Sequence, residues 1–311
     1  MKKYRKSIAI QGDPLNSLNS RTDTTILLAL EAQKRGYKIY YYETKNLTFL
    51  NGKIFSLCKE VVFFEKKKEF YSIKNLKTID LSNVNFILMR QNPPFNMDYI
   101  TATFLLEKIS KKTRIINDPA SVRNIPEKLH SMEFLRFMPA TIFTKNFKEI
   151  DKFLKKHKKI VIKPTHGYGG KNILFVSQRL KKKKILNYIA KHDQVMVQKF
   201  LPKIKEGDKR IFVIGGVIKG AIRRIPAQGS IISNIGQGGI ATKTTLTKRE
   251  LKIAKNVATN LKKNKIVFAG IDLISGYLTG DINITSPTGL KNYKDLTGVN
   301  LAVDFWNYLE N

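Results

Sequence analysis

Short apolar runs alternate with longer mixed stretches through the first third of the chain. Apolar runs of this length between turn residues are typical of buried strands, and the mixed stretches indicate helices. The pattern predicts strands over residues 7–10, 38–42, 86–89 and 114–116, and helices over residues 23–35 and 97–111. Strands that alternate with helices favour an α/β domain with a doubly wound parallel sheet. No Gly-x-Gly-x-x-Gly turn follows the first strand, which argues against a dinucleotide site there.

From about residue 120 the pattern changes to strands that are paired through glycine turns. It predicts strands over residues 160–163, 173–177, 194–200, 210–214, 217–225, 266–274 and 277–285, and helices over residues 180–191 and 247–263. The second of these helices opens on a capping box formed by Thr247 and Glu250. Asp118 and Pro119 form a turn signal between the two patterns. The chain is therefore predicted to change its strand pairing near residue 120.

The composition limits where the protein works. No segment approaches the roughly 18 uninterrupted apolar residues that a membrane span needs, and the apolar run at residues 8–10 is far too short for a secretory signal. The single cysteine, Cys58, cannot form a disulfide within the chain and is expected to be a packing residue. The histidines lack metal-ligand spacing. These features favour a cytoplasmic protein with no membrane partner and no zinc site.

The net charge of +33, from 57 basic and 24 acidic residues, raises the question of a nucleic-acid partner. The lysines, however, are spread through the chain, and the densest run, residues 179–184, opens a predicted surface helix. A charge run on a helix is usually a solvated face. We therefore expect no specific nucleic-acid partner and infer that the charge attracts anionic ligands.

A glycine-rich loop joins two of the predicted strands. Gly167, Gly169 and Gly170 would let the backbone approach a phosphate and direct several N–H groups at it. Lys163, on the strand before the loop, adds a positive charge. The loop lacks the Gly-Lys-Ser/Thr of a Walker loop and leads into a strand, so its context excludes a P-loop. An ordinary tight hairpin remains the alternative to a phosphate site.

Three oxygen-bearing side chains are predicted on one face of the last hairpin. A two-residue turn at residues 275–276 would pair Asp272 with Thr279. Period-two alternation then places Asp272, Asp281 and Asn283 on the same face. Hard oxygen ligands in this arrangement suit Mg²⁺ that bridges a nucleoside triphosphate. The alternative is a polar, solvated sheet face.

A series of short motifs occurs along the chain in a fixed order. They are Asp13-Pro14, residues 30–37, Leu50-Asn51-Gly52, Leu88-Met89-Arg90 with Pro93-Pro94-Phe95, residues 124–129, Ile162-Lys163-Pro164 with Gly167 and Gly169-Gly170, residues 207–210, Arg224-Ile225-Pro226, Gly270-Ile271-Asp272, and residues 282–288. In this order the chain resembles bacterial glutathione synthetase from residue 8 to about residue 288. No single motif is decisive, but together they cover nearly the whole chain.

The resemblance implies an α/β protein with an ATP-grasp fold behind an N-terminal doubly wound domain. The first domain would span residues 1–120 and the ATP-grasp domain residues 121–311, with a lid subdomain over about 121–195 and a C-terminal subdomain over about 196–311. Such a ligase phosphorylates the terminal carboxylate of γ-glutamylcysteine and joins the acyl phosphate to the amine of glycine. It would use ATP and Mg²⁺, with Mn²⁺ as a substitute, and would work as a homo-oligomer.

The matched motifs also imply residue roles. Lys163 and Arg210 would be catalytic, since they would neutralise the phosphates and the transferring phosphoryl group. Lys128 would join Lys163 at the phosphates, and Asp208 would lie near the ribose. Further nucleotide contacts would be the loop residues Gly167, Gly169 and Gly170 and the adenine frame Gln198, Lys199, Phe200 and Leu201. The substrates would be bound by Arg90, Arg224, Asn234, Ser286 and Thr288, and the metal by Asp272, Asp281 and Asn283.

Departures from the family concern the peptide side more than the ATP side. Gln91 and Asn92 stand where the family carries Lys and Asp, and Ile232 stands where Arg is usual. A ligase for a different carboxylate and amine is therefore an alternative, as is a non-catalytic protein that binds nucleotides or polyanions. At the metal face, Asp281 replaces Glu after one extra residue, Gly280, and a bulge could bring the shorter carboxylate to the metal. Further departures are Asn96, His166 and Asn292.

Overall fold

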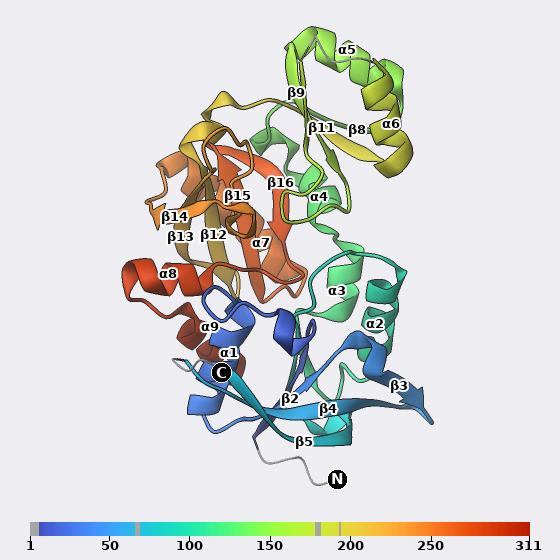
Figure 1. The fold of residues 1–311 in the computed structure, drawn as a ribbon, viewed down its shortest axis with the longest axis vertical. Coiled ribbons are helices and arrows are strands. Elements are labelled where there is room, and N and C mark those ends of the chain that lie inside the picture. The colour runs from blue at the N-terminus through green and yellow to red at the C-terminus, as the bar shows by residue number, and fades with distance from the viewer. Residues whose placement is uncertain (1–5, 66–68, 178–181, 193) are drawn as a thin grey trace.

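The computed structural model describes residues 6–65, 69–177, 182–192 and 194–311. Its strands form three sheets that follow one another along the chain. Figure 1 shows the first sheet at the base of the molecule, the third above it and the second at the top. The chain therefore passes through the top of the molecule before it returns to the middle.

The first sheet has a parallel centre and an antiparallel edge. Its order is β3-β4-β2-β1-β6-β7, with β5 also paired to β4. The strands are β1 (Ser7–Gln11), β2 (Lys38–Tyr42), β3 (Leu47–Leu50), β4 (Lys53–Phe63), β5 (Tyr71–Asp80), β6 (Phe86–Met89) and β7 (Arg114–Ile116). The predicted parallel pairing of β2, β1, β6 and β7 is confirmed. The antiparallel strands β3 to β5 are absent from the sequence prediction.

Helices cover both faces of this parallel centre. Along β1, Ile8 and Ile10 join the core on the side of α1 (Thr24–Lys34), whereas Ala9 joins the core on the side of α2 (Met97–Glu107). This alternation is the period-two pattern of a strand with two buried faces. The predicted doubly wound arrangement is thereby confirmed.

The second sheet is antiparallel, in the order β10-β9-β11-β8. Its strands are β8 (Thr141–Thr144), β9 (Lys159–Pro164), β10 (Leu174–Ser177) and β11 (Val195–Lys199). The lysine-rich helices α5 (Phe147–His157) and α6 (Lys182–His192) pack their apolar residues on the sheet, among them Ile150 and Ile185. The strand predictions at 160–163, 173–177 and 194–200 are confirmed. Residues 180 and 181 of the predicted 180–191 helix, and the first half of the charge run at 179–184, lie outside the described residues.

The third sheet is antiparallel and carries most of the predicted polar face. Its strands, in the order β14-β13-β12-β15-β16, are β12 (Asp208–Ile214), β13 (Val217–Ile225), β14 (Ile240–Lys243), β15 (Phe268–Ile274) and β16 (Tyr277–Asn283). Helix α7 (Lys248–Lys263) covers the sheet, and its predicted capping box is present. The predicted two-residue turn is confirmed by the pairs Ile274 with Tyr277 and Leu273 with Leu278. Beyond them the ladder bulges, so the predicted pairing of Asp272 with Thr279 is wrong.

Short helices connect the sheets. Asp118 caps α3 (Pro119–Asn124), because its carboxylate accepts the Ser121 N–H at 2.9 Å. Helix α4 (Glu127–His130) then packs against β16 and brings Lys128 to the third sheet. The 3-10 turns are Leu15–Ser17, Thr44–Asn46, Leu81–Asn83, Ser131–Phe137, Pro202–Glu206 and Ile235–Gln237.

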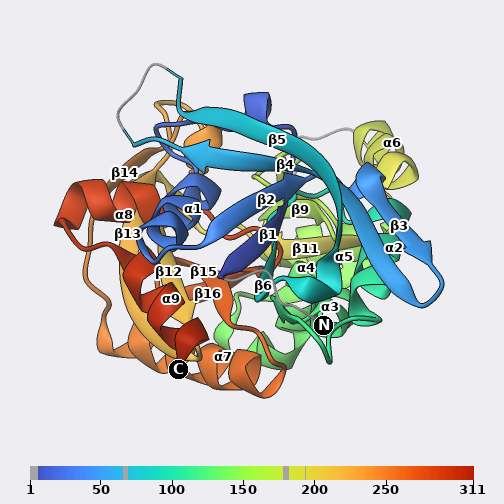
Figure 2. The same cartoon turned by 90° about the horizontal axis from the view of Figure 1, so that it is seen from below.

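The last two helices return to the first sheet. Figure 2 shows α8 (Leu290–Thr297) and α9 (Leu301–Glu310) on the same side of the molecule as α1, which both helices contact. Trp306 donates its indole N–H to the Leu28 carbonyl at 2.8 Å and stacks on Tyr37. These contacts hold α9 against α1. Among the described residues, no helix combines the length and the apolar character that crossing a bilayer requires.

Candidate active site

A cavity of about 480 Å³ opens between the first sheet, the glycine loop and the third sheet. All the predicted site residues except Arg90 lie on its wall. They are Lys128, Lys163, Gly167, Gly169, Gly170, Gln198, Lys199, Phe200, Leu201, Asp208, Arg210, Arg224, Asn234, Asp272, Asp281, Asn283, Ser286 and Thr288. Residues far apart in the sequence are thus gathered at one place.

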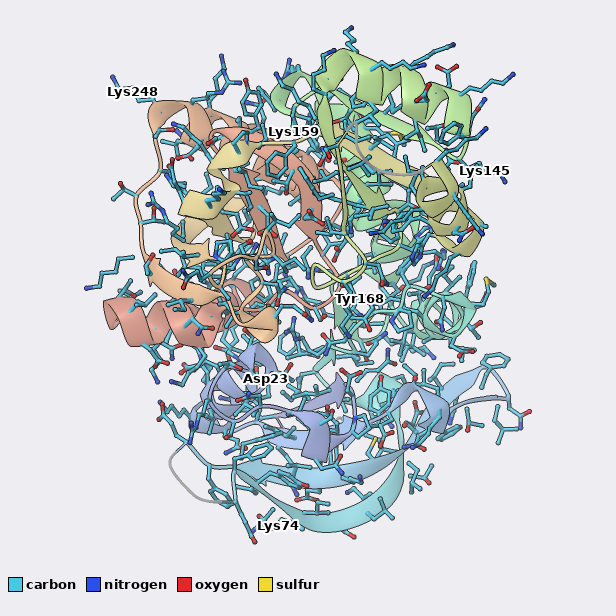
Figure 3. All side chains as sticks on the ribbon, turned by 45° about the horizontal axis from the view of Figure 1, so that its top comes forward. Asp23, Lys74, Lys145, Lys159, Tyr168 and Lys248 are labelled. Carbon is cyan, nitrogen blue, oxygen red and sulfur yellow. The ribbon has the colours of Figure 1, made fainter. Side chains whose placement is uncertain are left out.

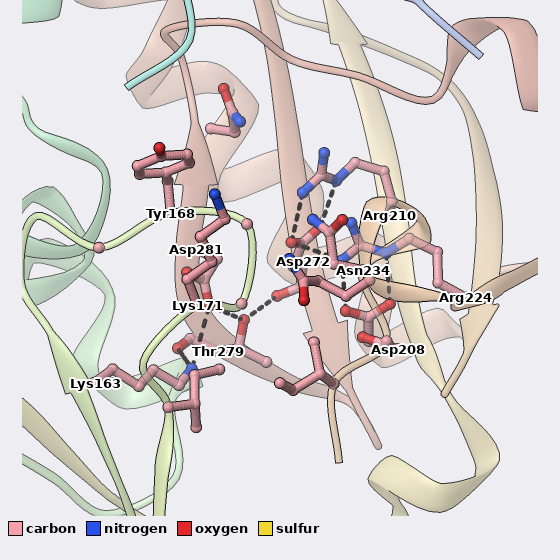
Figure 4. A pocket seen from close by; sticks show the side chains of 18 of the residues that line it. Lys163, Tyr168, Lys171, Asp208, Arg210, Arg224, Asn234, Asp272, Thr279 and Asp281 are labelled. Atoms are coloured by element: carbon pink, nitrogen blue, oxygen red, sulfur yellow. Dashed lines mark hydrogen bonds and ion pairs between the residues drawn. The ribbon is translucent and has the colours of Figure 1, made fainter. Parts of the chain in front are cut away.

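Two lysines and one carboxylate form the centre of the cavity. Lys163 on β9 and Lys128 on α4 each place Nζ 3.2 Å from a carboxylate oxygen of Asp281. Lys163 also donates to the Thr279 carbonyl at 3.0 Å, as Figure 4 shows, and Lys128 donates to the Gly167 carbonyl. Burial opposes ionisation of Asp281, but the two lysines outweigh it and hold the pKa of this carboxyl well below its usual value. Phosphate oxygens could replace Asp281 as partners of both lysines.

The glycine loop lies between β9 and β10 beside these lysines. Gly169 and Gly170 have φ values of +63° and +75°, which favour glycine over residues with a side chain. A Cβ on Gly170 would lie 2.6 Å from Ile232 Cγ2, so the loop backbone packs directly on that side chain. The loop therefore keeps its glycines for conformation and for close approach, as a loop over phosphates requires.

Cross-strand ion pairs line the wall opposite the loop. The register of the third sheet pairs Asp208 with Arg224 and Arg210 with Asp272. The Arg210 guanidinium donates Nε and Nη2 to the two Asp272 oxygens at 2.6 and 2.7 Å, and Arg224 bonds both Asp208 and Asp272. Burial opposes ionisation of Asp272, but the two arginines hold its pKa below the usual value. The Asp208 carboxylate, expected near a ribose, is engaged by Arg224.

The three residues predicted to bind a metal lie on β15 and β16. Asp272, Asp281 and Asn283 all border the cavity, and the bulge expected from Gly280 occurs in the β15 and β16 ladder. Gly280 has a φ of +88°, a value that few side chains permit. No group of three His, Cys, Asp or Glu among the described residues could hold a metal ion. A metal here would rely on two carboxylates and the amide oxygen of Asn283.

The donor set fits a nucleoside triphosphate with a divalent metal. Lysine Nζ atoms and loop N–H groups suit phosphates, and the carboxylate and amide oxygens suit a hard cation. Part of the cavity wall is apolar, as an adenine base prefers. It includes Val161, Ile173, Leu201, Ile204 and Ile222. The chemistry of the wall therefore matches both ends of the nucleotide.

Of the residues expected to bind the substrates, Arg90 lies behind the cavity wall and the others lie on it. Arg90 is buried and donates to the Thr25 hydroxyl at 3.1 Å and to the Pro287 carbonyl at 2.9 Å, so it holds α1 to the segment before α8. Asn234 lies on the cavity wall, where its side chain caps a 3-10 turn. Arg90 would therefore act on a ligand only through the wall it supports.

Most of the residues that differ from the family pattern lie at or near the cavity. Asn92, Ile232 and Asn292 border the cavity, so the neutral side chains face any bound ligand. Gln91 does not border the cavity; it is buried, and its amide has no hydrogen-bond partner among the described residues. Two further departures lie nearby. Asn96 caps α2 through the Tyr99 N–H, and the His166 ring lies 6.2 Å from that of Phe95.

Sequence reasoning missed Glu127 and Thr279. Both border the cavity, and Glu127 accepts the Thr285 hydroxyl at 3.2 Å. Burial raises the pKa of Glu127 to about 7, with Lys128 opposing the shift and Asp281 adding to it. The only sequence signal was that Glu127 precedes Lys128 within a matched motif.

The raised pKa of Glu127 predicts a pH-dependent stability. A carboxyl whose pKa is higher in the folded than in the unfolded chain stabilises the fold below its ordinary pKa, and this stability is lost as the pH rises through about 7. In the wild type, this group should lower the unfolding free energy by roughly 1 to 3 kcal/mol between about pH 4.5 and 7.5. We expect the Glu127→Gln protein to lack this fall, because glutamine does not titrate. Denaturant titrations in EDTA without nucleotide measure it.

Glu149 on α5 offers the matched control, because it is exposed. The Glu149→Gln protein should keep the pH dependence of the wild type. An equal dependence in the Glu127→Gln protein would show that Glu127 titrates normally.

Comparisons with known proteins agree with this geometry. Residues 7–123 match the family model of the prokaryotic glutathione synthetase N-terminal domain, and residues 127–298 match that of the prokaryotic glutathione synthetase ATP-grasp domain. The chain is 38% identical to a glutathione synthetase of Mesorhizobium japonicum over 308 residues, covering 97% of both chains. It is 37% identical to one of Rhodopseudomonas palustris over 311 residues, again covering 97% of both. The resemblance inferred from the motifs is thus confirmed.

Solved structures agree on the fold. A D-cycloserine synthetase, DcsG, superposes with a TM-score of 0.67 at 15% identity, over 97% of this chain and 99% of that one. The ATP-grasp ligase PsnB, in a complex with Mg and ADP, superposes with a TM-score of 0.66 at 16% identity, over 98% of each chain. The predicted α/β class and ATP-grasp fold are confirmed. The chain belongs to the prokaryotic glutathione synthetase family.

Proposed function

We propose that the protein is an ATP-dependent ligase that joins γ-glutamylcysteine to glycine through an acyl phosphate, with release of ADP and phosphate. The observation that carries the proposal is the convergence of Lys128, Lys163 and Arg210 with the oxygen ligands of the metal face around one cavity. Positioning and charge neutralisation are the main requirements for phosphoryl transfer. The family membership of the chain supports the same reaction.

The residues of the cavity divide the work of the reaction. Lys128 and Lys163 exchange Asp281 for phosphate oxygens when the nucleotide enters. Arg210 is held by Asp272 through Nε and Nη2, and its Nη1 makes only a 3.5 Å contact with the Thr288 carbonyl. That nitrogen is available to the phosphoryl group as it moves to the peptide carboxylate. The glycine loop then excludes water, which would hydrolyse the acyl phosphate.

Mg²⁺ is the metal we propose for the oxygen face, with Mn²⁺ as a substitute. Asp272, Asp281 and Asn283 would hold it, and bound there it would neutralise phosphate charge. We expect Asn283→Ala to raise the Mg²⁺ concentration needed for half-maximal activity on the order of tenfold, because a neutral oxygen ligand is lost. Titration of activity against Mg²⁺ and of Mn²⁺ binding by electron paramagnetic resonance measure the effect.

Asn292→Ala is the control for this variant, since Asn292 is another amide on the cavity wall but lies outside the metal face. It should leave the metal titration unchanged. Superimposable curves for the Asn283→Ala protein and the wild type would place the metal elsewhere.

A direct test of the reaction is the mass of its product. Purified protein incubated with ATP, Mg²⁺, γ-glutamylcysteine and glycine should yield glutathione and ADP in equal amounts. Absence of ADP release with any carboxylate and amine would contradict a ligase and leave a non-catalytic nucleotide-binding protein.

A second candidate is a ligase of the same family for another carboxylate and amine. It is favoured by the neutral side chains of Asn92, Ile232 and Asn292 on the cavity wall, where the family carries charges or other residues. The loss of each charge-assisted hydrogen bond that these neutral side chains cannot make would weaken binding of γ-glutamylcysteine on the order of tenfold. The same assay run across γ-glutamyl peptides and amino acids separates the two candidates by kcat/KM.

We also propose the wider organisation implied by the family. The working units are a domain of residues 1–120 and an ATP-grasp domain of residues 121–311, with subdomains divided near residue 195, and the protein functions as a homo-oligomer. A reaction that consumes ATP suits the cytoplasm, where ATP is available. Light scattering on the purified protein tests the oligomer, and limited proteolysis tests the domain boundary.

A further inference from the structure

The cavity wall holds carboxylates of two kinds. Asp208, Asp272 and Asp281 each form ion pairs with lysine or arginine. Asp23 and Glu127 have no ion-pair partner within the described residues, although both border the cavity. Glu127 lies near Lys128 and accepts a hydroxyl, whereas Asp23 comes from the first sheet's domain. Asp23 is therefore a carboxylate that faces the cavity without a cation to neutralise it.

The position of Asp23 is fixed by its local structure. It caps α1, since one carboxylate oxygen accepts the Thr25 N–H at 2.6 Å. The next residue, Thr24, is held by the Leu290 N–H, which approaches its hydroxyl to 3.3 Å. Figure 3 shows Asp23 at the upper edge of the lower domain, on the side that faces Tyr168 of the glycine loop. One carboxylate oxygen thus serves the cap, and the other can meet a ligand.

A second carboxylate, that of Asp13, lies near Asp23. Asp13 lies close enough to Asp23 that, after burial, the repulsion between them helps to raise the pKa of Asp13. Arg90 is the cation that both carboxylates sense, yet it donates to a hydroxyl and a backbone carbonyl and forms no ion pair with either. Neither carboxylate forms an ion pair within the described residues, although the chain carries a net charge of +33. This end of the cavity is suited to a cation.

We propose that Asp23 binds the α-ammonium group of the γ-glutamyl residue of the substrate. The inference rests on the proposed function, in which the other end of the peptide, its reacting carboxylate, lies beside Lys128 and Arg210. Asp23 borders the cavity from the start of α1, whereas Lys163 lies on β9 and Arg210 on β12, so Asp23 lies on a different wall from the groups assigned to the transferred phosphate. The half-buried carboxylate of Asp23 and an ammonium would form a short, charge-assisted hydrogen bond. Asp23 would thereby select peptides with a free α-amino group.

The test uses Asp23→Asn, which removes the charge and keeps a good helix cap, because Asn and Asp are nearly equal at this position. We expect the KM for γ-glutamylcysteine and its Kd in the presence of a non-hydrolysable ATP analogue to rise about tenfold or more. The KM for ATP should not change. With N-acetyl-γ-glutamylcysteine, which lacks the ammonium, the wild type and the variant should bind equally.

Asp118→Asn is the matched control, because Asp118 caps α3 in the same way but does not border the cavity. It should behave as the wild type with both peptides. An unchanged Kd in the Asp23→Asn protein, or an equal loss for the acetylated peptide, overturns the proposal while leaving the ligase activity established. If the wild type ligates no γ-glutamyl peptide, the proposed function fails first and this inference fails with it.

Discussion

Replacement of Lys163 by methionine is expected to reduce kcat for ligation by a factor on the order of 100 to 1,000, the loss typical when one group that stabilises the transition state is removed. Lys163 is buried between β9 and the glycine loop, and its Nζ lies 3.2 Å from Asp281. Methionine fills similar space but leaves Lys128 as the only lysine near Asp281 and the phosphate charge. Single-turnover measurements of ADP formation separate this loss of chemistry from weaker nucleotide binding.

Lys159 is the matched control on the same strand. It opens β9 and is exposed, so Lys159→Met makes the identical chemical change outside the cavity. We expect its kcat to equal that of the wild type. A Lys163→Met protein that turns over normally would contradict the assignment of this lysine to the phosphates.

Alanine at position 280 should destabilise the fold and disable the metal face together. Gly280 has a φ of +88°, and a Cβ there would lie 2.5 Å from Met196 Cε and 3.2 Å from Met138 Cε. Backbone strain of roughly 1 to 2 kcal/mol and overpacking of roughly 1 to 3 kcal/mol should add, because both methionines are buried. At about 2 to 4 °C for each kcal/mol, Tm should fall by at least roughly 4 °C. Calorimetry measures the fall.

Gly298 separates the two contributions. Its φ is +79°, and a Cβ would meet nothing within 4 Å, so Gly298→Ala carries the backbone strain alone. We expect it to lose less stability than Gly280→Ala and to keep its full response to Mg²⁺. Equal losses in the two variants would mean that Met196 and Met138 yield to the new methyl group without cost.

The sequence was most informative for strands that are buried on both faces of a sheet. The parallel strands of the first sheet are continuous apolar runs, which only a sheet covered on both faces produces. The antiparallel strands β4 and β5 escaped prediction because their outer face carries apolar side chains, among them Leu57 at 42% and Leu76 at 55% exposure. Apolar residues on both faces hide the alternation by which a half-exposed strand is recognised.

The sequence could predict which residues border the cavity, but it could not predict which of their side chains pair across the strands. Alternation along β16 placed Asp281 and Asn283 on one face, and both border the cavity. The bulge at Gly280 shifts the register, which no periodicity reveals. The bond between Arg210 and Asp272 depends on the register between β12 and β15, two strands separated by β13, β14 and α7. Such long-range pairing follows from the packing of the whole sheet.

The return of α9 to the first sheet has a consequence for synthesis of the protein. Phe305 and Trp306 belong to the same core as Ile8, Ile10 and α1, although nearly the whole chain separates them. A nascent chain cannot complete that core until α9 has left the ribosome. During translation the part of α1 that α9 covers therefore remains exposed, and the emerging chain has to be kept from aggregation until α9 docks.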